Sequence, residues 1–279
     1  MNNPQLVVRR MTADDLALAV DWAAEEGWNP GLNDADCFYQ ADPDGFFLAT
    51  VDNTPAGCIA AVAYDEQFGF VGLYLTRPNM RRYGVGMALL HAAKGYLGDR
   101  TIGADGVTNM VPKYLQIGFS PAHKNARYQG IGALYASSCA DPADISFAEL
   151  EPYDRRFFPA PRSRFLQRWI QQQGGCFRTV QAEGRLVGYG LLRPCRNGFK
   201  IGPLFADTPE IADELYRSLA SSAVGSPLFL DIPVCNRAAL ELVQRYGMTM
   251  VFETERIYRG APPPLPLEQI YGITSFELG

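Results

Sequence analysis

The chain reads VGLYLTRPNMRRYGVGMALL from Val71 to Leu90, and this stretch decides how the rest of the sequence is interpreted. Its first residues are apolar and aromatic and predict a strand, Pro78 interrupts regular pairing, and the residues after Gly84 predict a helix. Gly84 and Gly86 lack a Cβ atom, so the backbone can approach a ligand closely. The free N–H groups and the positive dipole end of a helix N-terminus bind anions. The stretch therefore predicts a phosphate-binding turn.

Three kinds of glycine turn compete for this stretch. A Walker A loop requires a closing Gly-Lys-Ser/Thr, which this sequence lacks here. A dinucleotide fingerprint requires a third glycine where Leu89 stands, and Asp105 at about 20 residues further on makes that match only partial. The pattern R-x-x-G-x-G is complete, with Arg81, Gly84 and Gly86. A tight turn whose glycines serve packing alone stays open as the alternative.

A second motif follows at residues 114–119, where YLQIGF predicts a short helix ending at Gly118 and a strand beginning at Phe119. Together the two motifs resemble motif A and the Y-x-x-x-G-F segment of the GNAT N-acetyltransferase superfamily. The resemblance covers Leu6 to about Tyr128. It implies an α/β fold with a mixed sheet flanked by helices, and acetyl-CoA as the co-substrate.

The resemblance also implies roles for individual residues. The acetyl-CoA pyrophosphate would bind backbone N–H groups of the turn, formed by Arg81, Arg82, Tyr83, Gly84, Val85, Gly86 and Met87. In the strand before it, Leu73, Tyr74 and Leu75 would carry a bulge whose unpaired N–H stabilises the oxyanion. The neighbouring strand that contains Asp105 would diverge from this one and admit the pantetheine arm.

Tyr114 would protonate the departing CoA thiolate, since a phenol with a pKa near 10 is a suitable donor. A half-buried packing tyrosine is the alternative. Asp105 is the first candidate for the general base, because a carboxylate that ends a central strand is costly to bury without a purpose. Its alternative role is structural, because Asp231 recurs at the equivalent place of the second half.

The acceptor side of the predicted site lies at the end of the first helix. Glu25, Glu26 and Trp28 stand where GNAT enzymes close over the acceptor, and they could bind a cation. A solvated helix end is the alternative interpretation of these residues.

The first half predicts the element order β-α-α-β-β-β-α-β-α-β. Thr12 and Asp15 predict a capping box for its first helix, Asn33 is expected to cap the second, and Thr101 to Val107 predicts the strand after the long helix.

The second half of the chain repeats the element order of the first. A hairpin, a strand, a helix that begins at Thr208, a strand with Asp231 and a helix ending at Gly247 follow in turn, which indicates a duplication of the fold. We therefore predict two tandem GNAT-like domains, residues 1–137 and 145–279. The apolar run 269–274 predicts a final strand that completes one of the two sheets.

The second half differs from the first at the positions that correspond to the glycine turn and the tyrosine. Residues 206–209, ADTP, replace the glycine turn, and Val243 stands at the tyrosine position. We therefore expect a degenerate second domain that serves as scaffold or substrate wall. Asn236 begins the sequence NRAA, which resembles an N-x-x-A segment that many GNAT enzymes use near pantetheine, whereas the first half has Val107 at that offset.

Composition limits the classes of partner. The 279 residues are 47% hydrophobic, enough for one large or two ordinary cores. The net charge of −5 argues against a nucleic-acid partner and mildly favours a cationic substrate. With six scattered cysteines and two histidines, we expect no metal site. The sequence shows no apolar run of membrane-spanning length and no signal peptide, so we expect a cytoplasmic protein without a membrane partner. Its oligomeric state is unknown.

We therefore predict an acetyl-CoA-dependent N-acetyltransferase whose acceptor is the primary amine of a small molecule, acylated by direct attack. Two alternatives stay open at this point. One is an acyl-CoA-binding regulatory module without turnover, and the other is a protein-lysine acetyltransferase. A second domain beside the cleft favours an enclosed small amine over a peptide.

Overall fold

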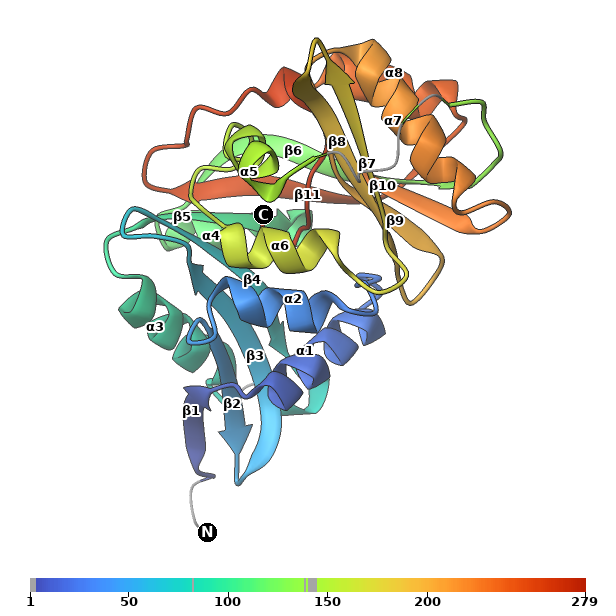
Figure 1. The fold of residues 1–279 in the computed structure, drawn as a ribbon. Coiled ribbons are helices and arrows are strands. Elements are labelled where there is room, and N and C mark those ends of the chain that lie inside the picture. The colour runs from blue at the N-terminus through green and yellow to red at the C-terminus, as the bar shows by residue number, and fades with distance from the viewer. Residues whose placement is uncertain (1–3, 82, 138, 140–144) are drawn as a thin grey trace.

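The computed structural model describes residues 4–81, 83–137, 139 and 145–279. Its described strands form one continuous twelve-stranded sheet in the order β1-β2-β3-β4-β5-β11-β6-β10-β9-β8-β7, with β12 paired to β9 (Figure 1). Most neighbours are antiparallel, and β4–β5 and β9–β10 are parallel. The predicted α/β class with a mixed sheet flanked by helices is confirmed. No helix in the described ranges has the length and apolar character needed to cross a membrane.

The first half contains the predicted β-α-α-β-β-β-α-β-α-β order. Its elements are β1 Leu6–Arg10, α1 Ala13–Glu25, α2 Asp34–Ala41, β2 Phe46–Val51, β3 Thr54–Ala63, β4 Phe68–Thr76, α3 Val85–Leu97, β5 Thr101–Val107, α4 Val111–Gln116 and β6 Ser120–Ile131. Thr12 forms the predicted capping box with Asp15 at the start of α1. Asn33 stands at the expected N-cap position of α2, but its side chain makes no capping hydrogen bond, and its amide donates instead to the carbonyl of Gln173 in the second half.

The described part of the second half repeats that order from its two helices onward, has no strand that corresponds to β1, and ends with an additional strand, β12. Its elements are α5 Phe147–Asp154, α6 Ser163–Ile170, β7 Cys176–Ala182, β8 Arg185–Pro194, β9 Phe199–Ala206, α7 Pro209–Ser221, β10 Pro227–Pro233, α8 Arg237–Arg245, β11 Thr249–Arg259 and β12 Ile270–Gly272. Thr208 and Asn236 cap α7 and α8 through their side chains. The strand predicted within 269–274 is present as β12. Most of the boundary stretch 136–144 lies outside the described residues.

The two halves exchange strands in the middle of the sheet. β11 of the second half lies between β5 and β6 of the first, and β6 in turn pairs with β10 (Figure 1). The sheet therefore runs through both of the predicted ranges, 1–137 and 145–279, without an edge between them. A sheet without an internal edge leaves no row of unpaired backbone groups at this junction.

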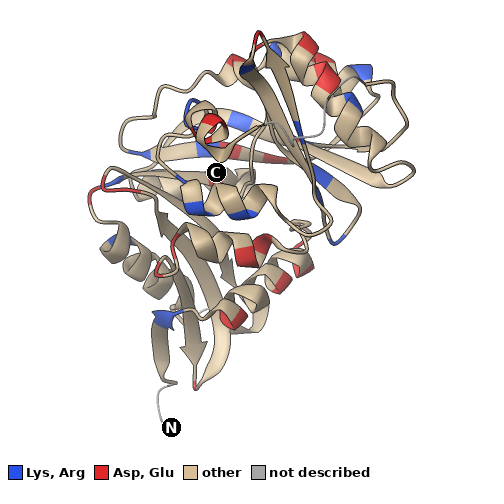
Figure 2. Ribbon diagram, viewed as in Figure 1, with Lys and Arg blue, Asp and Glu red and all other residues tan. Residues whose placement is uncertain are grey.

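Charged side chains also join the halves. Acidic residues stand on α1 and α2, and basic residues stand on α6 (Figure 2). At the surface, Asp36 pairs with Arg168 and Asp21 pairs with Arg196. Between them Asp34 and Arg193 form a fully buried salt bridge of 3.0 Å. Because a buried charge left without its partner is costly, this contact fixes how the α2 region sits on the second half.

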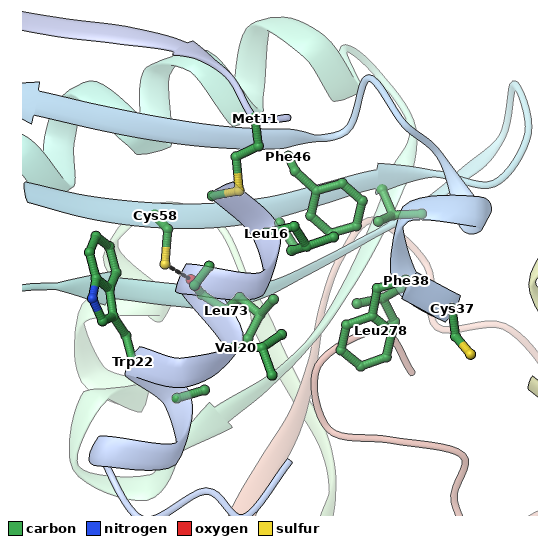
Figure 3. Close-up of a cluster of buried hydrophobic side chains, with 14 of the residues drawn as sticks. Met11, Leu16, Val20, Trp22, Cys37, Phe38, Phe46, Cys58, Leu73 and Leu278 are labelled. Carbon is green, nitrogen blue, oxygen red and sulfur yellow. Dashed lines mark hydrogen bonds between the residues drawn. The ribbon is translucent and has the colours of Figure 1, made fainter. Parts of the chain in front are cut away.

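The first-half core also receives residues from the end of the sequence. Figure 3 shows side chains from α1, α2 and β2–β4 in one cluster together with Leu278. Leu278 is fully buried there, and its carbonyl accepts a hydrogen bond of 2.9 Å from the hydroxyl of Tyr64. Residues 273–279 therefore cross from the second half into the core of the first.

Candidate active site

The predicted glycine turn leads into α3. Gly84 is the N-cap residue with a φ of +77°, in the left-handed region that favours glycine. The first turn of α3 begins at Val85, and its backbone N–H groups have no partner within the helix. A Cβ atom on Gly86 would lie 2.7 Å from the hydroxyl of Tyr74, so glycine at this position keeps the turn close to β4. Arg82 lies outside the described residues.

β4 carries the predicted bulge beside this turn. Cys58 pairs with Leu75 and Ala60 pairs with Gly72, so two residues of β4 lie opposite one residue of β3. Leu73, in the bulge, has a φ of +46°, a conformation that costs a leucine about 1 kcal/mol or more. The thiol of Cys58 donates to the Leu73 carbonyl at 3.1 Å (Figure 3). The bulge is thus a strained conformation of the strand that a buried hydrogen bond stabilises.

β4 and β5 diverge just past this point. Their parallel pairing runs from Phe68–Thr101 to Val71–Ala104 and then stops. A cavity of about 940 Å³ opens between the separated strands. The expected divergence of the strand that contains Asp105 is therefore present, and it leaves room for an extended ligand.

The cavity collects most of the residues that the sequence singled out. Its walls include Leu73, Tyr74, Leu75, Arg81, Met87, Asp105, Tyr114, Glu26 and Trp28. Glu25 points elsewhere and pairs with Arg77 at the surface. The prediction that Glu25 binds the acceptor is thus not supported by its position, because Arg77 already neutralises its charge.

Tyr114 lies on α4 at the β5 side of the cavity. Its ring lies over Gly106, where a Cβ atom would be 3.0 Å away, and it contacts the ring of Phe119 edge-on at 6.1 Å. Burial raises the pKa of Tyr114 above its usual value. The pKa of Tyr74 is raised to about 12 by burial and, to a smaller extent, by Tyr114. Both phenols therefore keep their protons at neutral pH, and Tyr114 can act as a donor.

Asp105 lies in the cavity wall, but its carboxylate already has partners. Arg256 on β11 is its direct cross-strand neighbour and binds it through two hydrogen bonds of 2.9 and 2.7 Å, and Asn125 donates a third of 2.8 Å. Burial raises the pKa of Asp105, and Arg256 opposes that shift. A carboxylate held this way is poorly placed to take a proton from an amine, so the contacts favour the structural alternative for Asp105.

Two family models match the chain in succession. The model described as "Acetyltransferase (GNAT) family" matches residues 14–119, and the one described as "Acetyltransferase (GNAT) domain" matches residues 150–272. The chain is a tandem GNAT protein. Membership in this family identifies it as an acyltransferase, and the bulge, the diverging strands and the glycine turn are the parts of the first half that such a protein requires.

Relatives match this GNAT protein over most of its length. It is 27% identical to "Holothin acyltransferase" of a Pseudoalteromonas species, over 93% of this chain and 90% of the relative. It is 24% identical to an uncharacterised N-acetyltransferase of Bacillus subtilis, over 75% of this chain and 76% of the relative.

Solved structures share the fold. A crystal structure of a Pyrococcus horikoshii protein assigned as an acetyltransferase has a TM-score of 0.83 at 22% identity, over 98% of this chain and 96% of the other. A tandem GNAT protein from the clavulanic acid biosynthesis pathway has a TM-score of 0.63 at 15% identity, over 93% of this chain and all of the other.

The second half of this GNAT protein has filled its own version of the cleft. β9 and β10 stop pairing after Ile201–Leu230, as β4 and β5 do, but β12 pairs with β9 and occupies the gap. The side-chain amide of Asn236 donates to the carbonyls of Ile270 and Glu268 at 2.9 and 3.1 Å. The asparagine that resembles a pantetheine-binding residue therefore holds the chain itself.

In the second half, the loop that stands in place of the glycine turn makes contacts with other residues of the protein. Asp207 pairs with Arg156 at 3.0 Å and accepts a hydrogen bond from the hydroxyl of Tyr153. A carboxylate at this place repels pyrophosphate. Both features agree with a second domain that is degenerate as an acyl-CoA site.

The sequence offered no signal for the second-half residues that line the cavity. They are Phe252, Thr254, Arg259, Phe276 and Glu277. They reach the site because β11 exchanges into the first half and because residues 273–279 return to it. Neither event follows from a local pattern. Within the described residues no group of three or more histidines, cysteines, aspartates and glutamates is placed to hold a metal ion.

Proposed function

We propose that this protein is an acetyl-CoA-dependent N-acetyltransferase that acylates the primary amine of a small molecule by direct attack. The proposal rests on the observation that three parts of the first half meet at one cavity. Arg81 and Met87 on either side of the α3 N-cap, the β4 bulge and Tyr114 all line one cavity, which is where pyrophosphate, thioester and leaving thiolate of one bound acetyl-CoA would lie.

The proposed binding mode follows from the chemistry of each part. The pyrophosphate receives hydrogen bonds from backbone N–H groups between Gly84 and Met87, assisted by the helix dipole. Arg81, Lys94 and Lys113 also line the cavity and add positive charge. The pantetheine arm extends between β4 and β5 toward the bulge. These interactions bind substrate and transition state alike, so they determine affinity rather than rate.

The transfer itself needs two groups. As the amine nitrogen attacks the thioester carbon, the carbonyl oxygen becomes an anion that a backbone N–H near Leu73–Leu75 stabilises. The C–S bond then breaks, and Tyr114 gives its proton to the sulfur. Removing one oxyanion donor typically lowers kcat by about 10²–10³-fold, and we expect the N–H group of the bulge to contribute a factor of this size.

A small acceptor is favoured over a peptide because second-half residues close the far end of the cavity. Phe252 and Phe276 stand there, and their rings contact each other edge-on at 5.9 Å. The relative named holothin acyltransferase supports acyl transfer as the reaction of this architecture.

The test is a screen for acetyl-CoA-dependent thiol release with amines, amino acids, aminoglycosides and lysine peptides as acceptors. We expect release with one or more small amines and none above the background rate with peptides. Stoichiometric acetyl-CoA binding with no release for any acceptor would instead identify a regulatory module. Preferred turnover of peptides would favour protein-lysine acetylation.

A further inference from the structure

Residues 273–279 form a fixed structure at the acceptor end of the cavity. Thr274 accepts a hydrogen bond of 3.0 Å from Arg162, and the backbone N–H of Leu278 donates to the Ser275 hydroxyl at 3.0 Å. Leu278 lies in the first-half core beside Phe38 (Figure 3). The segment is therefore anchored on both sides of Phe276 and Glu277.

This segment brings Glu277 next to the bulge. The carbonyl oxygen of Glu277 lies 1.8 Å from where a Cβ atom on Gly72 would be, so only glycine at position 72 allows the contact. Gly72 directly precedes Leu73, the residue with positive φ in the bulge. Glu277 thus lies beside the strand segment that would receive the thioester carbonyl.

Glu277 is a buried carboxylate without a partner. Only 3% of the residue is exposed, and it lines the cavity. Across the described part of the chain, no hydrogen bond or salt bridge reaches its carboxylate oxygens. A buried charge without a hydrogen-bond partner is costly, and a cationic ligand with N–H donors would relieve that cost.

The nearby cations are already neutralised by other acids. Arg127 binds Asp231 through two hydrogen bonds of 2.7 Å, and Arg193 binds Asp34 at 3.0 Å. Glu277 acts on both guanidinium groups only at longer range. Its negative charge therefore remains available to a ligand in the cavity.

The walls around this carboxylate are aromatic. Phe252 and Phe276 stand next to it, and the guanidinium of Arg127 lies 5.0 Å from the centre of the Phe276 ring on which it stacks. The same guanidinium donates to the carbonyl of Trp28, which also lines the cavity. The cavity wall thus contains the buried carboxylate of Glu277 together with aromatic side chains, and Glu26 is a further carboxylate in that wall.

We propose that Glu277 binds the ammonium group of the acceptor and takes its proton, and that the acceptor is a compact amine with an apolar or aromatic body. This inference rests on the proposed acetyl transfer.

The proposed step balances as follows. One N–H proton of the ammonium passes to the Glu277 carboxylate, and the freed lone pair forms the N–C bond to the thioester carbon. The C–S bond breaks, and the sulfur takes the proton of Tyr114. The new amide nitrogen loses a second proton, which returns through water to Tyr114. Glu277 then releases its proton to solvent, so the sum is one amide, one CoA thiol and one proton.

The test uses the full chain with CoA bound, and two probes that differ in one group, 2-phenylethylamine and 2-phenylethanol. By titration calorimetry we expect the wild-type protein to bind the amine about tenfold or more tightly than the alcohol, as a charge-assisted hydrogen bond predicts. Glu277→Gln should lose that preference while binding the alcohol as before. Glu183→Gln, in the exposed β7–β8 turn, is the matched control and should change neither affinity.

Equal wild-type affinity for the two probes would overturn the proposal without any variant. An amine affinity unchanged in Glu277→Gln would do the same. Thiol release separates this result from the proposed function. Wild-type turnover of 2-phenylethylamine that persists in Glu277→Gln keeps acetyl transfer and removes Glu277, whereas the binding preference without any turnover keeps the amine site and removes acetyl transfer.

Discussion

Asp105 and Asp231 occupy equivalent strand ends, and each is paired with an arginine that the other half supplies. Arg256 of β11 lies opposite Asp105, and Arg127 of β6 lies opposite Asp231. Both salt bridges are buried and 2.7 Å long. The recurrence of the aspartate therefore has a structural cause, because the exchanged strands need it in both halves.

We expect Asp105→Asn and Asp231→Asn to behave alike. Each leaves a buried guanidinium without its counter-ion, at a cost of about 3–5 kcal/mol in unfolding free energy. Thermal unfolding should show this as a fall in Tm of roughly 5 °C or more. Below that temperature kcat should change little in Asp105→Asn.

Asp231→Asn serves as the control here, since it alters the same type of contact away from the cavity. A kcat that collapses in Asp105→Asn alone, with Tm intact, would restore Asp105 as the general base.

Tyr114→Phe should lower kcat by about 10²–10³-fold with little change in acetyl-CoA affinity, because the hydroxyl acts on the departing sulfur. Steady-state kinetics and calorimetry on the same preparation measure the two effects separately. Because burial raises the pKa of Tyr114, the midpoint of any loss of activity through deprotonation of this phenol should lie above pH 10, the usual value for tyrosine. An unchanged kcat would leave Tyr114 as a packing residue.

The roles of some residues could be predicted from their neighbours in the sequence, whereas the roles of others could not. The Thr12 capping box and the Gly84 N-cap follow from neighbours within a few positions. Asn33 failed as a cap because a carbonyl of the other half competes for its side chain. Glu277 gave no signal in the sequence, since its burial depends on contacts with Gly72 and the first-half core, about 200 residues away.

At the scale of elements, α3 combines a binding end and a structural end. Gly86 stands in its first turn, against the hydroxyl of Tyr74, whereas a Cβ on Gly95 would meet nothing within 4 Å. The two glycines thus offer a matched pair of substitutions in one helix.

Gly86→Ala should raise KM for acetyl-CoA severalfold, since the added methyl group displaces Tyr74 or the pyrophosphate. Gly95→Ala should leave KM unchanged and increase the unfolding free energy by about 0.5–1 kcal/mol, the usual gain of alanine over glycine within a helix. Kinetics and denaturant titrations measure both. Equal KM values in the two variants would argue that the turn does not bind the cofactor.

Elements were predictable where periodicity and turn chemistry are local. β5 was expected at Thr101–Val107 and is found there, and both α7 and α8 begin at their predicted caps. The position of β11 between β5 and β6 was not predictable. Strand order depends on pairing between segments that are distant in the sequence. β5 and β10 end the two halves of the sheet in the same way, so the local sequence does not decide which of the strands β6 and β11 pairs with which of them.

At the scale of the molecule, the exchanged strands make each half depend on the other. A chain ending at about residue 140 would keep β5 without β11, and Asp105 without Arg256. It would also lose Leu278 from its core. We expect this fragment to be insoluble or inactive by expression and thiol-release assays, and co-expression with residues 145–279 to restore solubility.

The full-length protein produced in parallel is the control for that experiment. A soluble fragment with full turnover and the same acceptor preference would show that the second half has a separate task.

We propose that one half holds acetyl-CoA, and the other half has filled its own cleft with β12. Titration calorimetry of the full chain with acetyl-CoA distinguishes one working site from two. We expect one site per chain, lost in Gly84→Glu, which places a carboxylate at the helix N-terminus that receives the pyrophosphate. Two sites per chain, or binding undiminished in Gly84→Glu, would contradict it.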